Sequence, residues 1–220
     1  MKNFDWGAFF GDILSVMLGI FITFGIQGMI DRRAERKDVK SALALVREEL
    51  VVNKGSLEEV INLISSEKDA AVYIRNNAGQ LSKCNQDTLN LKNAFLTSEY
   101  FFTVTDDALE LLKTSSLFQK MNDNELALSI IKAYDYLDVN SQAFNKHEKY
   151  KTSVLEEANN SRAKKAALTN SGLDFFTIFY SSPEADYFLK SVIEMSDISF
   201  LLEGMEEVDA TIAALDKRLN

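Results

Sequence analysis

The feature that most constrains this chain is an apolar segment near its N-terminus, AFFGDILSVMLGIFITFGIQGMI, which covers residues 8–30 and is followed directly by DRRAERKDVK. Residues 13–30 contain no charged side chain. A helix needs ~20 predominantly apolar residues to cross the ~30 Å hydrocarbon core of a bilayer. The sequence therefore predicts an N-terminal tail and one transmembrane helix within residues 1–30, followed by a separate domain over residues 31–220.

A cleaved signal peptide is the alternative interpretation of this segment. Such a peptide has a positively charged beginning and a small-residue cleavage site of the A-x-A type. Here Lys2 is offset by Asp5, and no A-x-A motif precedes Asp31. A permanent anchor is the favoured interpretation.

The distribution of positive charge predicts how the anchor is oriented. Only Lys2 precedes it, whereas a positive-inside cluster follows it, made of Arg32, Arg33, Arg36, Lys37 and Lys40. Because Lys and Arg concentrate on the cytoplasmic side of a membrane helix, we expect the N-terminus outside and the C-terminal domain in the cytoplasm. The single cysteine agrees with a reducing compartment, since it can form no intrachain disulfide.

Polar and small residues of the anchor fall on one side of the predicted helix. At ~100° per residue they share an arc of roughly 120°, and they are Asp12, Ser15, Gly19, Thr23 and Gln27. Such faces mediate helix association in membranes, where small residues permit close approach and polar ones form hydrogen bonds. Two other interpretations stay open: Asp12 sits at headgroup level and the face is incidental, or the face lines a water-filled pore.

The composition indicates a folded, all-α protein. Hydrophobic residues make up 46% and charged residues 26%, which is typical of globular domains. Proline occurs once in the 220 residues, so helix breakers are rare. The net charge of -9 argues against a nucleic-acid partner, which normally meets a basic stripe.

Directly after the anchor, a 4-3 spacing predicts a long helix over about residues 31–76 with a coiled-coil-like seam. Asn53 occupies a seam position that can fix register, and Gly55 is the weak point at which a kink is plausible. The seam positions are Val39, Leu43, Val46, Leu50, Asn53, Leu57, Val60, Ile64, Glu67, Ala71 and Ile74.

Two further long helices are predicted, and with short helices between them they make an elongated antiparallel bundle. One runs over residues 123–168 after a capping box at Asn122 and Glu125, with a break possible at residues 159–161. Its polar stretch after Lys146 is either solvated or paired with the polar base of the first helix. Another begins at Ser182 and Pro183. In that region the 4-3 spacing returns as Ile198, Leu201, Met205, Val208, Ile212, Leu215 and Leu219.

No catalytic, cofactor-binding or metal-binding set is evident, and we expect a protein that is not an enzyme and needs no cofactor. Nucleotide-binding and nucleophile motifs are absent, and the chain has one histidine and one cysteine. His147 is expected to be solvated and Cys84 incidental. The adjacent acidic pairs diverge on a helix and predict solvated faces.

Two segments outside the long helices could be contact sites. The apolar stretch LDFFTIFY, residues 173–180, predicts a helix that caps the core, with docking of a partner as the alternative. Arg162, Lys164 and Lys165 would meet anionic headgroups if the second long helix returned toward the bilayer; a solvated turn is the alternative.

The stretches VMLGIFITFGIQGMIDRRAERK, LVREEL and TDDALELLKTSSLFQKMNDNELALSIIKAYDYLD resemble a family of single-pass, N-terminally anchored helical proteins of Bacteroidota and related bacteria. That family has no assigned function, so the resemblance implies only a bacterial inner-membrane location. From the residues we expect a membrane-anchored, self-associating scaffold or sensor that presents its cytoplasmic bundle to a protein partner. The alternative is an oligomeric, pore-forming or gated effector.

Overall fold

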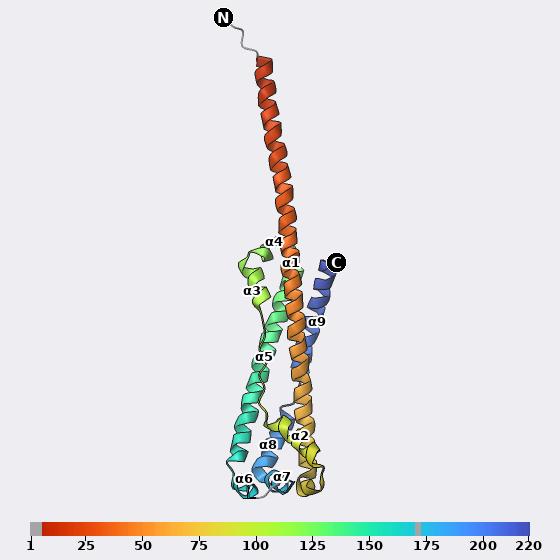
Figure 1. The fold of residues 1–220 in the computed structure, drawn as a ribbon, viewed down its shortest axis with the longest axis vertical. Coiled ribbons are helices and arrows are strands. Elements are labelled where there is room, and N and C mark those ends of the chain that lie inside the picture. The colour runs from red at the N-terminus through yellow and green to blue at the C-terminus, as the bar shows by residue number, and fades with distance from the viewer. Residues whose placement is uncertain (1–5, 170–172) are drawn as a thin grey trace.

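A computed structural model describes the backbone of residues 6–169 and 173–220, and the side chains of residues 33–161, 164–169 and 174–220. Within these ranges all regular secondary structure is helical, so the protein is all-α, as predicted (Figure 1). In chain order the helices are α1 (Trp6–Asn77), the 3-10 helix η1 (Ala78–Lys83), α2 (Gln86–Thr97), α3 (Asp107–Thr114), α4 (Leu117–Lys120), α5 (Asn124–Asn159), α6 (Arg162–Ala167), α7 (Leu173–Tyr180), α8 (Pro183–Glu194) and α9 (Ser199–Leu219).

Helix α1 is the axis of the molecule and continues unbroken past Gly55, so the kink considered there is not present. Every seam position predicted between Val39 and Ile74 is buried, including the polar Asn53 and Glu67. The 4-3 spacing places these residues on one stripe of the helix, and that stripe faces α5, α8 and α9.

Helix α5 runs in the same direction as α1, whereas α8 and α9 run back against both (Figure 1). Glu49 of α1 contacts Tyr134 of α5, and Glu67, further along α1, contacts Lys151, further along α5. Residue numbers therefore rise together in the two helices. Along α9 the order is reversed, since Arg47 pairs with Asp216 and Lys54 with Asp209. The predicted antiparallel arrangement therefore holds for α8 and α9 but is wrong for the pair of α1 and α5.

A non-helical strap, residues 98–106, makes this parallel arrangement possible by carrying the chain back along the bundle from α2 to α3 (Figure 1). Side chains of the flanking helices satisfy its backbone. Asn53 of α1 exchanges two hydrogen bonds with Thr105, at 2.7 and 3.0 Å. Asn145 of α5 does the same with Phe102, at 3.0 and 2.9 Å. Buried backbone N–H and C=O groups must form hydrogen bonds. In the strap, the side-chain amides of Asn53 and Asn145 provide the partners that a neighbouring strand would provide in a β-sheet.

Glu49 of α1 fixes the upper end of the strap. Its carboxylate accepts the backbone N–H of Ala108 at 3.0 Å, in the first turn of α3, and the hydroxyl of Tyr134 from α5. A carboxylate at a helix N-terminus is favourable because free N–H groups and the positive end of the dipole lie there. Glu49 therefore joins three helices.

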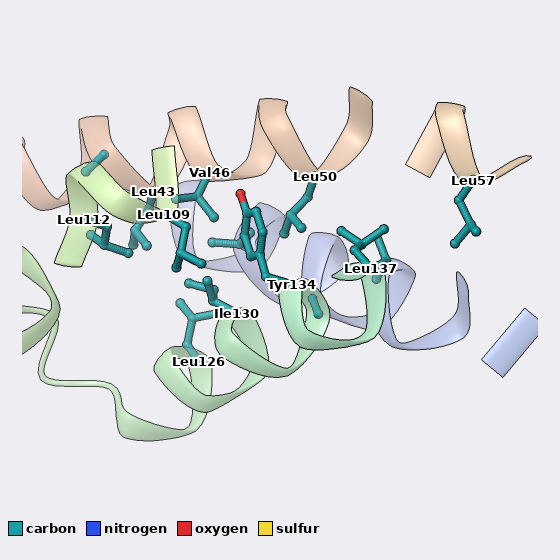
Figure 2. Close-up of a cluster of buried hydrophobic side chains, with 14 of the residues drawn as sticks. Leu43, Val46, Leu50, Leu57, Leu109, Leu112, Leu126, Ile130, Tyr134 and Leu137 are labelled. Atoms are coloured by element: carbon teal, nitrogen blue, oxygen red, sulfur yellow. The ribbon is translucent and has the colours of Figure 1, made fainter. Parts of the chain in front are cut away.

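The apolar interior forms two clusters. The first joins α1, α3, α5 and α9, and Figure 2 shows Tyr134 of α5 reaching toward α1 between Val46 and Leu50. The second lies at the far end of the bundle, where Phe176 and Tyr180 of α7 are buried. Residues 173–180 therefore cap the core, in line with the favoured prediction for this segment.

Helix α9 buries a stripe shifted from the predicted one. Its most buried positions are Leu201, Gly204, Val208, Thr211 and Leu215, whereas Met205, Ile212 and Leu219 are only half-buried. Small residues at Gly204 and Thr211 bring the helix close to α5. A Cβ placed on Gly204 would lie 2.0 Å from Nδ2 of Asn140.

Helix starts and ends agree with the sequence to within one or two residues, except at the end of α5 and at residues 195–198, where the long helix predicted from Ser182 is divided into α8 and α9. Ser182 caps α8 as predicted, accepting the N–H of Ala185 at 3.2 Å. The cap of α5 is Asp123, one residue beyond the predicted Asn122, whose φ is 51°. The break at residues 159–161 is present, so α5 ends at Asn159 and α6 follows.

The cluster of Arg162, Lys164 and Lys165 belongs to α6, at the end of the bundle remote from the N-terminal part of α1 (Figure 1). The headgroup alternative for this cluster required the second long helix to run back along the first, and this condition is not met because α5 runs parallel to α1. Lys164 instead lies over the rings of Phe175 and Phe179, with Nζ 4.7 Å from each ring centroid. Burial lowers the pKa of Lys164.

Among the residues described with their side chains, no helix has a stretch both long enough and apolar enough to span a bilayer. The predicted anchor at residues 8–30 lies outside those residues, as do its face of Asp12, Ser15, Gly19, Thr23 and Gln27 and the first basic residue, Arg32.

Candidate functional site

Four ionisable side chains form a polar layer between the two apolar clusters. Glu67 comes from α1, and His147, Glu148 and Lys151 come from α5. Glu67, Glu148 and Lys151 are among the most buried polar residues of the described chain.

Continuation of the α5 seam explains how these charges become buried. The 4-3 spacing does not stop at Phe144, because Glu148 and Lys151 take the next two seam positions and Leu155 and Ala158 the two after them. Of the two alternatives for this polar stretch, solvation or pairing with the polar base of the first helix, the structure shows pairing at Lys151 and Glu67. Following the spacing, irrespective of polarity, would have found the layer.

The ammonium group of Lys151 is the centre of the layer. It donates hydrogen bonds to Oε1 of Glu67, to Oε2 of Glu148 at 2.9 Å and to the carbonyl of Ser98 in the strap at 2.9 Å. A lysine has three N–H donors, and all three are used. The ring of Tyr100 lies over the same group, with its centroid 5.7 Å from Nζ.

The two oxygens of the Glu148 carboxylate differ in their hydrogen-bond partners. Oε2 accepts from Lys151 and from the backbone N–H of Tyr100, the latter at 3.0 Å. Oε1 is buried and accepts no hydrogen bond from any residue that the structure describes. Burial raises the pKa of Glu148 and the charge of Glu67 adds to this effect, whereas Lys151 and the Tyr100 N–H oppose it. A buried carboxylate oxygen without a partner is costly.

The imidazole of His147 faces the two carboxylate oxygens that Lys151 does not bind, and it forms a hydrogen bond with that of Glu67 but not with that of Glu148. Its Nε2 lies 3.3 Å from Oε2 of Glu67 and 3.8 Å from Oε1 of Glu148, and its side chain is 10% exposed. The ring stacks on Phe144, with centroids 6.3 Å apart. The expectation of a solvated His147 is wrong, because the parallel course of α1 and α5 turns this part of α5 toward Glu67.

Two pockets flank the polar layer. One of about 640 Å³ lies between α5 and α8 and is lined by His147 together with Tyr150, Tyr187 and Phe200. Another, of about 620 Å³, lies between α1 and the strap and includes Tyr100. Phe144 lines both pockets. The layer is therefore buried but adjacent to space that a small molecule or ion can enter.

A different feature occupies the end of the bundle from which the N-terminal part of α1 projects (Figure 1). Arg36 and Lys40 of α1, Lys120 of α4 and Arg218 of α9 line a pocket of about 410 Å³. Lys120 pairs with Glu35 at 3.1 Å, and Arg218 donates to the carbonyl of Met121 at 3.4 Å. We call these four cations the basic end. It gathers charge from segments far apart in the sequence, which spacing alone could not show.

The remaining predicted site residues are placed as follows. Arg33, Arg36, Lys37 and Lys40 of the positive-inside cluster are exposed on α1. Cys84 is half-buried beside the second apolar cluster, and its Sγ lies 3.8 Å from the carbonyl of Gln80.

Comparison with known proteins found no matching family model, curated protein or solved structure. The fold and the site themselves define the class: an elongated helical bundle with an ionisable layer in its core.

Proposed function

We propose that this chain is a membrane-anchored helical scaffold or sensor, which self-associates and presents its bundle to a protein partner in the bacterial cytoplasm. The observation that carries the proposal is the basic end, which lies where α1 leaves the bundle toward the predicted anchor.

The basic end contrasts with the charge of the whole chain. The net charge is -9, yet four cations from three helices meet at this one end. Anionic headgroups attract juxtamembrane Lys and Arg by about 1 kcal/mol each. This arrangement supports a bilayer next to the basic end, with the remainder of the acidic bundle pointing into the cytoplasm.

Helix α1 supports a role in transmission. It passes without a break from Trp6 into the core of the bundle, and residues 33–77 alone extend ~65 Å at ~1.5 Å per residue. A continuous helix is stiff over this length, so a shift or rotation of the anchor is carried to the polar layer and the far end. A sensor or a spacer requires such a stiff connection between its anchor and its distal end.

Exposed apolar residues on α1 support contact with a second copy of the chain. Leu45 is 47% and Val52 is 63% exposed, and they are one heptad apart. Counting ~100° per residue along the continuous helix, both fall on the same side as Thr23 and Gln27 of the predicted association face. A second copy is therefore the occupant we propose for this stripe.

Membrane insertion and orientation are tested with the native Cys84, the only cysteine of the chain. The full chain should remain in membranes after alkaline carbonate extraction. A membrane-impermeant maleimide should leave Cys84 unlabelled in intact spheroplasts and label it after lysis. Release by carbonate, or labelling in intact spheroplasts, would show that the proposal is wrong.

Self-association is tested by chemical crosslinking in native membranes. Substituting Leu45→Gln together with Val52→Gln should reduce the crosslinked dimer or higher oligomer. The matched control is Leu128→Gln with Val139→Gln, because both residues are 59% exposed on α5. A chain that stays monomeric, or an equal loss in both double variants, would reject the α1 contact. Ion flux through reconstituted vesicles would instead support the pore alternative.

A further inference from the structure

Two carboxylates and one imidazole of the polar layer converge on a single point. Lys151 binds Oε1 of Glu67 and Oε2 of Glu148, which leaves the other oxygen of each carboxylate directed at His147. One ligand atom from each of Glu67, His147 and Glu148 lies within 4.8 Å of the other two.

The free oxygen of Glu148 is a second, independent observation. Oε1 is fully buried, and no residue in the described part of the chain donates a hydrogen bond to it. Nε2 of His147 lies 3.8 Å from it. A buried anionic oxygen requires a compensating charge or donor, and a cation between these atoms would supply it.

The separations fit metal ligands better than ion pairs. Charge-assisted hydrogen bonds are ~2.7–2.9 Å long, whereas the hydrogen bond between Nε2 of His147 and Glu67 is long, at 3.3 Å, and Nε2 lies 3.8 Å from Glu148. Ligands around a tetrahedral zinc ion are ~3.3 Å apart, since each bond is ~2.0–2.1 Å. A small closure of the three side chains would therefore bring their three ligand atoms to the spacing of a tetrahedral site, with the fourth position open.

We propose that Glu67, His147 and Glu148 form a binding site for a divalent transition-metal ion of the zinc class. One nitrogen and two oxygen donors favour such an ion over Ca²⁺ or Mg²⁺, which prefer oxygen alone. Lys151 is a positioning residue, because it holds the second oxygen of each carboxylate ligand. The pocket of about 640 Å³ that His147 lines gives the ion a route in and room for a water or small anion as fourth ligand.

The competing account is that His147 is protonated and balances the two carboxylates with Lys151, without a metal. The two accounts differ in what zinc does to the imidazole. A metal-bound nitrogen cannot carry a proton, so zinc takes the place of the proton on Nε2 and changes the ring signals of His147. In the competing account these ring signals are the same with and without zinc.

The experiment uses the full chain in detergent micelles, in a Cys84→Ser background and with a tag that contains no histidine. Because His147 is the only histidine, the NMR signal of its ring can be followed in histidine-labelled protein with ZnCl₂ or with EDTA. We expect one Zn²⁺ per chain and a clear change in the ¹⁵N signal of Nε2 when zinc binds. Ring signals that are the same with ZnCl₂ and with EDTA would overturn the proposal without requiring any variant to fold.

Variants then assign the ligands. His147→Gln and Glu148→Gln should each weaken zinc binding by more than about tenfold, measured by competition with a chelating dye. Glu157→Gln, an exposed acid on the same helix, is the matched control and should bind as tightly as the parent. Equal affinity in His147→Gln and the parent would refute the site. Zinc binding in micelles does not depend on membrane insertion in cells, so each proposal can fail without the other.

Discussion

Lys151 of α5 and Glu67 of α1 form an ion pair in which both side chains are almost completely buried, with exposed fractions of 1% and 0%. The two residues belong to helices that run in parallel, so the pair fixes their relative height. The carbonyl of Ser98 binds the same ammonium group, which adds the strap to the alignment. One lysine thus connects three segments.

Removal of this lysine should be strongly destabilising. Lys151→Met leaves Glu67 and Glu148 as two buried carboxylates without their cation, and breaking a buried pair costs about 3–5 kcal/mol. The free energy of unfolding is measured by urea denaturation in EDTA. Lys149→Met, an exposed lysine on the same helix, should change it by less than about 0.5 kcal/mol. Adding Glu67→Gln to Lys151→Met should recover part of the loss, and no recovery would contradict this account.

Glu148 should contribute to the pH dependence of stability with a defined sign. Burial raises its folded pKa above the ordinary value of 4.5, so between the two values the folded state holds more protons than the unfolded state. Stability therefore falls as pH rises through this window. Below the ordinary value and above the folded pKa the contribution is constant.

A comparison with Glu148→Gln isolates this contribution, because other titrating groups are common to both proteins. In metal-free buffer, the unfolding free energy of the variant minus that of the parent should increase as the pH is raised from about 4.5. Chemical denaturation at a series of pH values measures it. A difference that decreases with pH would show that Lys151 outweighs burial.

Asn53 should be needed for the strap to stay docked. Asn53→Ala removes the two hydrogen bonds between the side-chain amide and the backbone of Thr105, and each such bond contributes about 0.5–1.5 kcal/mol. We expect a loss of about 1–3 kcal/mol and faster amide hydrogen exchange in residues 98–106. Asn62→Ala, on an exposed part of α1, is the control and should leave exchange in the strap unchanged.

Two glycines in long helices should respond oppositely to alanine. A Cβ on Gly55 meets nothing within 4 Å, so Gly55→Ala should stabilise the protein by up to about 1 kcal/mol through helix propensity. A Cβ on Gly204 would meet Asn140, so Gly204→Ala should destabilise it by about 1–3 kcal/mol.

Removing the Asn140 side chain tests whether its overlap with a Cβ at position 204 causes the loss of stability. In an Asn140→Ala background the obstacle to a Cβ is gone, and Gly204→Ala should become stabilising, like Gly55→Ala. Thermal or urea unfolding of the four proteins in a double-mutant cycle measures the coupling. Additive effects would mean that the approach of α5 and α9 is not set by this contact.

The sequence by itself determined where most of the helices lie and which face of α1 is buried. The seam from Val39 to Ile74, the cap at Ser182 and the apolar helix at residues 173–180 could all be predicted. Such features depend on neighbours within a few turns, through side-chain spacing, capping and the scarcity of proline and glycine. The positions in α1 that depart from an apolar seam of good helix formers, Gly55, Asn53 and Glu67, were also visible in the sequence.

Only the tertiary structure decided the direction of α5, and with it the polar layer and the basic end. Heptad spacing is the same for parallel and antiparallel neighbours, so it does not say which charges meet. The strap sets the direction, because side-chain amides from two helices satisfy its backbone and let the chain return before α5 begins. The parallel course then brings Glu67 to His147, Glu148 and Lys151, residues 80 or more positions away. A burial that depends on such distant partners has no local signal beyond the continued 4-3 spacing.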